Sequence, residues 1–321
     1  MRVGDAKAWG MSDTFASEDL FLRPAIFREL EPPAILGVFG DPVAHSLSPG
    51  FQTAALVAAG IHGQYVRVLA HAGEFSEAAR RIGSAGWVGA NVTIPHKAAA
   101  LALVDEAEDS ARLSGGVNTL VVEGERLLGF STDGPGLARA IHEEFYADLR
   151  DLRVLLLGAG GGAGRAAAVQ CAKDGCERLV LANRSFEKAA ALAAELSPWF
   201  QSDRLIGPAD RLVAIPMTRD ALRDQIAQVD IVINATSLGM GRADPSPLPA
   251  ALLTANLMVM DMVYAGRKSR LLLDAEGMGA RAVDGLSMLL HQGALSFEIW
   301  FNRPAPLEAM RARLKADAAA R

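Results

Sequence analysis

Residues 153–164, RVLLLGAGGGAG, decide which fold this sequence predicts. An apolar run leads directly into glycines, and an alanine-rich stretch typical of a helix then continues to Asp174. Glycines let the backbone approach a pyrophosphate, whose charge then lies at the N-terminus of the helix. The pattern Gly158-x-Gly160-x-x-Ala163 therefore predicts a dinucleotide-binding loop, with Ala163 in place of the usual third glycine of close helix packing. The alternative is a tight turn without a ligand.

The next predicted strand, RLVLANRS, indicates which dinucleotide the loop would bind. A site for NAD usually carries an acidic residue about twenty positions after the loop. Here Asn183, Arg184 and Ser185 end the strand instead, and Lys188 follows one turn later. Because a guanidinium can bind a 2′-phosphate through several N–H donors, we predict NADP rather than NAD. A solvated basic helix start is the alternative, since Glu187 reduces the local charge.

Short apolar strands alternate with helical stretches on both sides of the loop, which implies a mostly parallel α/β sheet. The predicted strands lie at 34–40, 64–69, 87–93, 178–185, 211–216, 230–236, 257–264 and 280–285, besides the one that begins at Arg153, with a hairpin over 117–130. Helices are predicted from Ser48, over 73–83 and 94–105, from Pro135 to Tyr146, after the glycine loop, and over 287–302 and 306–319.

The chain has 321 residues, enough for two domains. We predict an α/β protein in which residues 34–136 plus 286–321 form a substrate-binding domain with a mostly parallel sheet. Residues 137–285 are predicted to form a Rossmann-type domain. The last two helices follow the last sheet strand, so we expect them to pack back on the first domain. Residues 1–33 are expected to be a loosely ordered extension, with a short helix near Phe15 to Leu22.

Composition narrows the class of protein and its partners. Half of the residues are hydrophobic and 21% are charged, as in globular proteins. The formal net charge is −5 and no basic stripe offsets it, which argues against a protein that binds nucleic acid. Glycines and Arg165 interrupt the most apolar stretch, 154–172, and residues 1–33 lack the apolar core of a signal peptide. We expect a cytoplasmic protein without membrane partners. Cys171 and Cys176 are expected to be reduced, buried or half-buried thiols, because no second pair completes a zinc site.

Two dense motifs precede the glycine loop, and each contains a candidate acid–base residue. Lys97 closes GANVTIPHK (89–97), and Asp133 lies in GFSTDGPG (129–136). Reduction of a ketone by hydride requires a proton donor at the carbonyl oxygen, where negative charge develops. A lysine and a carboxylate in one cleft, facing a nicotinamide, would meet that requirement. The alternatives are a solvated surface lysine and an aspartate that caps the helix at Pro135.

Further polar candidates lie in HSLSP and VNTL. Ser46 and Ser48 offer two hydroxyl donors beside a predicted helix N-terminus. Such donors can bind a carboxylate without an arginine, although N-capping is the more frequent use of a serine at this place. Asn118 could bind a ligand or simply stabilise a turn.

In order and spacing, these motifs resemble those of the shikimate dehydrogenases, NADP-dependent enzymes of aromatic amino-acid biosynthesis. The resemblance extends from about Ile35 to Trp300 and rests on GVFGDPVAHSLSP, GANVTIPHK, GGVNTL, GFSTDG, LGAGGGAGR, NRS, NATSLGM, DMVY and DGLSMLLHQGALSFEIW. It implies an oxidoreductase that acts on a CH–OH group, reduces 3-dehydroshikimate to shikimate reversibly with NADPH, and needs no metal.

The resemblance also implies a role for each matching residue. Lys97 and Asp133 would be the catalytic pair. The substrate would be bound by Ser46, Ser48, Thr93, Asn118, Tyr264 and Gln292. NADP would be bound by Gly158, Ala159, Gly160, Gly161, Gly162, Ala163, Asn183, Arg184, Ser185, Lys188, Asn234, Thr236, Met240, Met262 and Gly285.

Several positions depart from the common pattern of the family. Gln52 and Thr53 replace a histidine and an asparagine, Gly116 replaces an alanine, and Ser131 replaces an asparagine. Small changes around a ring pocket alter which hydroxylated acid fits, so a quinate/shikimate dehydrogenase or a related paralogue is the first alternative. A nucleotide-responsive binding protein without turnover is the second. Family members are monomers or homodimers, and either state is expected here.

Overall fold

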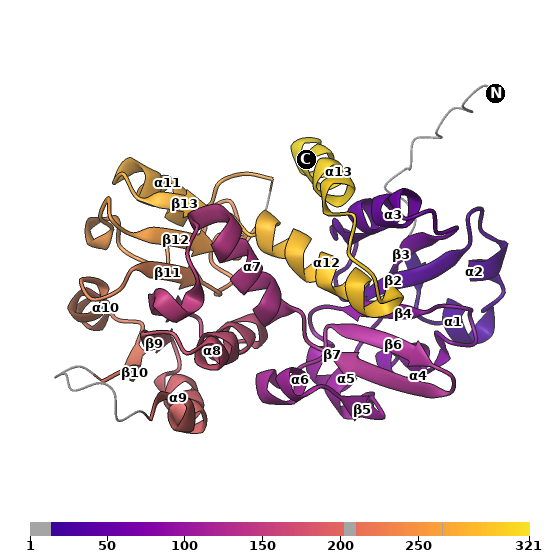
Figure 1. The fold of residues 1–321 in the computed structure, drawn as a ribbon, viewed down its shortest axis with the longest axis horizontal. Coiled ribbons are helices and arrows are strands. Elements are labelled where there is room, and N and C mark those ends of the chain that lie inside the picture. The colour runs from indigo at the N-terminus through magenta and orange to yellow at the C-terminus, as the bar shows by residue number, and fades with distance from the viewer. Residues whose placement is uncertain (1–13, 202–209, 265) are drawn as a thin grey trace.

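The computed structural model describes residues 14–201, 210–264 and 266–321. These residues form two β-sheets, the first built from the N-terminal part of the chain and the second from the later part. Helices α7 (Asp133–Phe145) and α12 (Leu286–Phe301) lie between the two sheets (Figure 1). The predicted α/β fold, with one unit for substrate and one Rossmann-type unit, is confirmed.

The first sheet has the strand order β1-β3-β2-β4-β6-β7-β5, in which β1, β3, β2 and β4 are parallel and the β6–β7 hairpin is antiparallel, as predicted. Its strands are β1 (Thr14–Ala16), β2 (Ala34–Gly40), β3 (Gln64–Leu69), β4 (Gly89–Val92), β5 (Glu106–Ala107), β6 (Thr119–Glu123) and β7 (Arg126–Phe130). Its helices are α1 (Asp19–Leu22), α2 (Ile26–Glu29), α3 (Ser48–Ala58), α4 (Phe75–Arg81), α5 (Lys97–Leu103) and α6 (Asp109–Ser114).

The second sheet has the order β10-β9-β8-β11-β12-β13 with every neighbouring pair parallel, which is the Rossmann arrangement. Its strands are β8 (Arg153–Leu157), β9 (Arg178–Asn183), β10 (Leu212–Pro216), β11 (Ile231–Asn234), β12 (Met258–Asp261) and β13 (Arg281–Val283). Its helices are α8 (Gly162–Asp174), α9 (Phe186–Phe200), α10 (Arg219–Ile226) and α11 (Arg270–Gly277).

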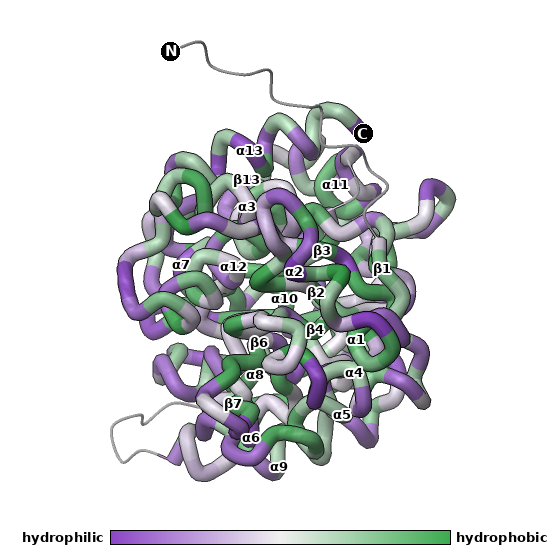
Figure 2. Tube along the Cα trace, turned by 90° about the vertical axis from the view of Figure 1, so that its right-hand side faces the viewer, coloured by the Kyte–Doolittle hydropathy of each residue, from purple (hydrophilic) through white to green (hydrophobic). Residues whose placement is uncertain are grey.

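Continuous apolar runs form the central strands because both faces of each sheet are covered. In β8, Val154 and Leu156 enter one core with helices α7 and α8, whereas Leu155 and Leu157 enter the core on the opposite face with α10 and α11. Hydrophobic segments accordingly lie along the inner strands, and many outer helical turns are hydrophilic (Figure 2). Cys171 and Cys176 are buried free thiols, as predicted. None of the described helices has the length and apolar character needed to cross a membrane.

The C-terminal helices return to the first sheet, which confirms the prediction. Helix α13 (Leu307–Ala319) packs on α3, and α12 packs on α7 and α3 (Figure 1). Leu290 and Phe297 of α12 share a core with Leu36 and Val38 of β2. The predicted helices therefore cover the face of β2 that α4 leaves open.

The N-terminal segment differs from the expectation. Residues 14–33 are not loosely ordered, because β1 pairs with β3 at the edge of the first sheet and Phe27 is fully buried. The ring centroid of Phe27 lies 4.9 Å from that of Phe15 and 5.3 Å from that of Trp87. The expected helix near Phe15 to Leu22 is limited to α1, because Phe15 belongs to a strand. A strand of three residues shows no detectable period in the sequence. Residues 1–13 lie outside the described residues.

Candidate active site

The predicted substrate residues lie at one edge of the first sheet. Strands β2 and β4 are parallel, and β7 runs in the same direction as β4 because both pair antiparallel with β6. The HSLSP loop follows the end of β2. Lys97 and Asp133 are the first residues of α5 and α7, just after β4 and β7. All three segments therefore meet where the strands end, which is the usual position of ligands in open α/β sheets.

Lys97 and Asp133 are in direct contact. The Lys97 Nζ donates to Asp133 Oδ2 at 2.5 Å, and the two side chains are 23% and 11% exposed. Lys97 is therefore not a freely solvated surface lysine. Capping of α7 by Asp133 is not observed either, because the other carboxylate oxygen accepts from Asn118. A half-buried ammonium held against a carboxylate can deliver a proton to an oxygen placed beside it.

Asn118 joins the pair to the neighbouring substrate candidates. Its Nδ2 donates to Asp133 Oδ1 at 2.9 Å and to Thr132 Oγ1 at 2.9 Å, and its Oδ1 accepts from the Thr132 backbone N–H at 2.9 Å. Gln292 Oε1 of α12 lies 3.4 Å from the same Nδ2. Asn118 thus holds the chain before α7, as a turn-stabilising asparagine would, and also binds the Asp133 carboxylate.

The serine loop is fixed by main-chain contacts. The Ser48 backbone N–H donates to Ser46 Oγ at 3.3 Å, and no side chain caps α3 beyond this contact. Arg67 of β3 donates to the Ser46 carbonyl oxygen from Nε at 3.2 Å and from Nη2 at 2.7 Å. Ser48 lies beside the buried Tyr65, and burial raises the pKa of Tyr65 well above its ordinary value. The capping role predicted as the alternative for Ser48 is not observed.

Thr93 and Tyr264 are also among the predicted substrate residues. Thr93 connects β4 to α5, and its backbone N–H donates to the Phe39 carbonyl oxygen at 2.9 Å. Tyr264 packs beside Leu286, and burial raises the pKa of its phenol. Within residues 14–201, 210–264 and 266–321, neither hydroxyl forms a hydrogen bond to the protein. Both hydroxyls are therefore available to a ligand.

The glycine loop has the backbone geometry that a phosphate site requires. Gly158 has a φ of +84°, in the left-handed region that favours glycine. A Cβ on Gly164 would lie 2.2 Å from the Gly158 carbonyl oxygen, so helix α8 packs directly on the loop at Gly164. The sequence predicts this close approach at Ala163, whereas in the structure it occurs at the next residue, Gly164. A Cβ on Gly162 would meet no atom within 4 Å, which leaves open space at the start of α8.

The end of β9 lies next to this loop. The Gly160 backbone N–H donates to Asn183 Oδ1 at 3.2 Å, so Asn183 holds the loop. Arg184 and Lys188 are exposed, and neither pairs with a carboxylate in the described part of the chain. Two free cations beside a glycine loop fit the 2′-phosphate of NADP, together with its pyrophosphate at the start of α8.

The segment predicted to line the nicotinamide is held by a buried network. Asn234 Oδ1 accepts from Thr236 Oγ1 at 2.7 Å, and Asn234 Nδ2 donates to Asp261 Oδ1 at 2.8 Å. Ser269 Oγ donates to the other Asp261 oxygen at 2.5 Å. Burial raises the pKa of Asp261. Asn234 and Thr236 thus shape the segment, and Met240 at its end is 65% exposed.

Met262 and Gly285 complete the predicted cofactor side. The Met262 backbone N–H donates to the Asn234 carbonyl oxygen at 3.0 Å. A Cβ on Gly285 would lie 2.2 Å from the Met262 carbonyl oxygen, so a larger residue would separate the two segments. The structure therefore brings the ends of β11, β12 and β13 together.

Two residues with positioning contacts were absent from the sequence prediction. Arg67 holds the serine loop, and Asp261 holds Asn234. Gly164 closes the predicted loop 158–164, but its role in letting α8 approach the loop was given to Ala163. A charged residue inside an otherwise apolar strand is the signal that could have revealed Arg67 and Asp261.

Models of known families match most of the chain. The shikimate dehydrogenase substrate binding domain matches residues 38–120, shikimate/quinate 5-dehydrogenase matches 137–240, and the shikimate 5′-dehydrogenase C-terminal domain matches 285–315. The shikimate dehydrogenase (NADP(+)) of Symbiobacterium thermophilum is 40% identical over 282 residues, which are 87% of this chain and 93% of that one. The chain belongs to the shikimate dehydrogenase family.

Solved structures of shikimate dehydrogenase relatives share the fold. The shikimate 5-dehydrogenase of Thermus thermophilus, in complex with NADP(H) and shikimate, has a TM-score of 0.76 and 32% identity, covering 88% of this chain and 98% of that one. The quinate dehydrogenase of Corynebacterium glutamicum, in complex with NAD, has a TM-score of 0.75 and 27% identity, covering 88% of this chain and 99% of that one. The fold of the shikimate dehydrogenase family therefore hosts more than one ring acid.

Proposed function

We propose that this protein catalyses the reversible, NADPH-dependent reduction of 3-dehydroshikimate to shikimate. The observation that supports the proposal most strongly is the contact between Lys97 and Asp133, completed by Asn118. These three residues come from separate motifs, and they meet at the edge of the first sheet that faces the glycine-loop unit. Family membership and the substrate names of the relatives support the same activity.

In the proposed mechanism, NADPH supplies the hydride when it is bound. Lys97 Nζ donates a proton to the oxygen of the ketone as negative charge develops there. Asp133 orients the ammonium group and stabilises its charge through the 2.5 Å contact. In the reverse direction, Lys97 accepts the proton of the ring hydroxyl. The pair would thus serve as acid in one direction and as base in the other.

The remaining candidates would position the substrate. We assign Ser46, Ser48 and Tyr264 to its carboxylate, because these are neutral hydroxyl donors. The raised pKa of Tyr264 keeps its phenol protonated, and therefore able to donate, at neutral pH. Thr93, Asn118 and Gln292 would bind ring hydroxyls beside Lys97. Three or more directional contacts fix which ring carbon faces the cofactor.

The cofactor proposal is NADP rather than NAD. Gly158 to Ala163 would bind the pyrophosphate, and the exposed Arg184 and Lys188 would bind the 2′-phosphate. Asn183 and Ser185 would border the 2′-phosphate. The nicotinamide would be surrounded by Asn234, Thr236, Met240, Met262 and Gly285. The NADP named for the curated relative supports this choice.

Quinate is the second candidate substrate, because a quinate dehydrogenase shares this fold. The sequence departures near the serine loop do not favour it. Gln52 is fully buried and donates to the Gly293 carbonyl oxygen at 2.9 Å, and Thr53 Oγ1 accepts from the Tyr65 backbone N–H at 3.1 Å. Both side chains therefore pack α3 against α12 and β3. They give no reason for a changed ring specificity.

The deciding experiment is a kinetic matrix of shikimate and quinate with NADP and NAD, followed by the absorbance of the reduced cofactor. We expect kcat/KM for shikimate with NADP to exceed each of the other three combinations at least about tenfold, equal to about 1.4 kcal/mol. A larger kcat/KM with quinate would replace shikimate by the second candidate. Cofactor binding without turnover of either acid would favour a binding protein. If the protein has this activity, we also propose that it acts in the cytoplasm, in the biosynthesis of aromatic amino acids.

A further inference from the structure

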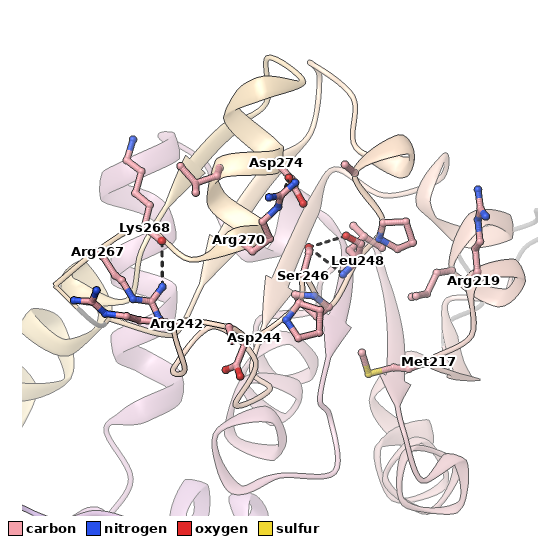
Figure 3. A pocket seen from close by; sticks show the side chains of 17 residues that line it. Met217, Arg219, Arg242, Asp244, Ser246, Leu248, Arg267, Lys268, Arg270 and Asp274 are labelled. Carbon is pink, nitrogen blue, oxygen red and sulfur yellow. Dashed lines mark hydrogen bonds and ion pairs between the residues drawn. The ribbon is translucent and has the colours of Figure 1, made fainter.

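A second concave site lies on the Rossmann-type unit, next to the predicted cofactor residues Asn183 and Met240 but lined by other residues. It has a volume of about 880 Å³ and is formed by the segments that follow β10, β11 and β12 (Figure 3). Its walls include Met217, Leu222, Leu273 and the proline-rich stretch 245–249. None of the predicted catalytic, substrate or cofactor residues lines it.

Basic residues dominate the charge of this groove. Its lining contains Arg219, Arg242, Arg267, Lys268 and Arg270 but only two carboxylates, Asp244 and Asp274. Both carboxylates are already engaged by the protein. Asp274 Oδ1 accepts from Arg270 Nε at 2.8 Å, and Asp244 Oδ2 accepts from the backbone N–H groups of Gly239 at 3.0 Å and Gly241 at 2.8 Å.

Two guanidinium groups in the groove have no carboxylate partner in the described part of the chain. Arg242 forms no hydrogen bond or ion pair there. Within the described ranges, Arg267 donates only to main-chain carbonyl oxygens, those of Gly239 and Met240 at 3.3 Å and that of Lys268 at 3.5 Å. Arg242, Arg267 and Lys268 lie at one end of the groove (Figure 3). Like charges held together are costly unless an anion joins them.

The other basic residues extend this charge along the groove. Lys268 is bound to Glu276, outside the lining, with its Nζ 2.5 Å from Oε1. Arg219 lies at the opposite end, and it is the first residue of α10, where the helix dipole disfavours a cation (Figure 3). It has no ion pair in the described residues. An unneutralised cation therefore stands at each end of the groove.

We propose that this groove binds a small phosphorylated compound at a site separate from the cofactor. Guanidinium groups bind phosphate oxygens through two parallel N–H donors, which suits the Arg242 and Arg267 end. The volume falls in the range of small-molecule sites. Pro245, Pro247 and Pro249 restrict the facing wall, so little order would be lost when a ligand binds.

The test is isothermal titration calorimetry, in which inorganic pyrophosphate is added to the full-length protein at low salt without magnesium. Saturating NADP is present so that the proposed cofactor phosphate positions are filled. We expect one molecule of pyrophosphate to bind the wild-type protein. The double variant R242Q/R267Q should bind at least tenfold more weakly. R242Q alone, which removes no contact of the described protein, should already weaken binding measurably.

The matched control is R303Q/K315Q, which removes two exposed cations from the first-sheet side of the molecule. It should bind pyrophosphate as the wild type does, and thermal denaturation checks that all variants are folded. Absence of binding, or equal weakening in the control, would overturn the proposal. Binding of hexaglutamate at Arg242 and Arg267 without binding of pyrophosphate would also overturn it, in favour of an acidic peptide. None of these outcomes affects the proposed dehydrogenase activity, which the kinetic matrix of substrates and cofactors tests separately.

Discussion

At the scale of single residues, the chemistry depends on one ammonium group. Among the described residues, Asp133 is the one carboxylate that Lys97 Nζ contacts. The main-chain oxygen of Lys97 accepts from the Val117 N–H at 3.0 Å. The contact with Val117 fixes the backbone of Lys97 beside the segment that carries Asn118, just before β6. The Lys97 side chain is therefore positioned by its contact with Asp133 and by the backbone contact with Val117.

Replacing Lys97 by alanine should lower kcat for shikimate oxidation by about 10²–10⁴-fold, the usual contribution of a positioned acid or base. KM for shikimate should change little, because the carboxylate and ring contacts are assigned to other residues. K97R is the informative control, since arginine keeps the charge but cannot release a proton. Steady-state kinetics of both variants decide the matter. Recovery of kcat in K97R would show that charge alone suffices, contrary to the mechanism proposed.

Replacing Arg184 by glutamine should reduce kcat/KM for NADP at least about tenfold, because a charge-assisted contact to the 2′-phosphate is lost. The value for NAD should stay within about twofold. The comparison of both cofactors in one variant separates lost phosphate recognition from general damage. Equal losses with the two cofactors would argue against a role in cofactor choice.

The sequence predicted the candidate site residues better than the residues that hold them in position. Lys97, Asp133 and Asn118 stand in dense polar motifs at the ends of apolar strands, so strand direction alone places them at one edge. Arg67 acts through a carbonyl oxygen twenty-one residues away, and Asp261 acts on a side chain of the neighbouring strand. Such contacts depend on strand register. One sequence without coordinates does not specify register.

At the scale of elements, the close packing of α7 on α12 positions the substrate side. A Cβ on Gly136 would lie 2.7 Å from Gln292 Cβ and 2.8 Å from its backbone nitrogen. Backbone atoms cannot rotate away as a flexible side chain can. The two helices therefore approach each other this closely only because residue 136 is a glycine.

The G136A variant should lose about 1–3 kcal/mol of unfolding free energy, the range for overpacked interiors. Its KM for shikimate should rise, because Gln292 moves with α12. The matched control is G277A, at the end of α11, where a Cβ would meet no atom within 4 Å. That variant should be neutral or gain up to about 1 kcal/mol. Urea unfolding of the three proteins measures both effects, and equal stabilities would contradict the close packing.

The elements that were predicted are those with a clear apolar run or a clear helix start in the sequence. Every strand of the second sheet, the β6–β7 hairpin and both C-terminal helices were predicted from apolar runs and helix signals. Helices α6, α9, α10 and α11 were not predicted. The short elements β1, β5 and α2 were not predicted either, since isolated segments of two to four residues carry no period. Their stability comes from packing, as the buried Phe27 shows.

At the scale of the whole molecule, an ionic cluster joins three helices between the two sheets. Glu143 of α7 accepts from Arg311 of α13 at 2.6 and 2.8 Å and lies 2.8 Å from His291 Nε2 of α12. Burial lowers the pKa of His291, and the charges of Arg311 and Arg139 act in the same direction against the attraction of Glu143. Burial alone would raise the pKa of Glu143, but the hydrogen bonds from Arg311 and His291 outweigh it and the pKa lies below its ordinary value.

Both shifts make the folded protein less stable in acid. The unfolded chain protonates His291 below about pH 6.5, whereas the folded protein resists that proton, so stability falls as the pH drops from 7 to 5. The contribution of Glu143 is lost at lower pH still. In H291Q, the loss of melting temperature between pH 7 and 5 should be smaller, while H62Q, at an exposed position, should match the wild type. Parallel melting curves for all three would exclude His291 as the cause.

Helix α12 has a further consequence for how the protein reaches this state in the cell. Met288 enters the core of the later sheet, and Leu290 and Phe297 enter the core of the earlier one. Residues 286–321 leave the ribosome after all the described strands, the last of which is β13. Until then the apolar side chains of β2 and α3 lack their cover, and the nascent chain offers that surface to chaperones. Helix α12 thus completes the cores of both sheets, after translation of the described strands.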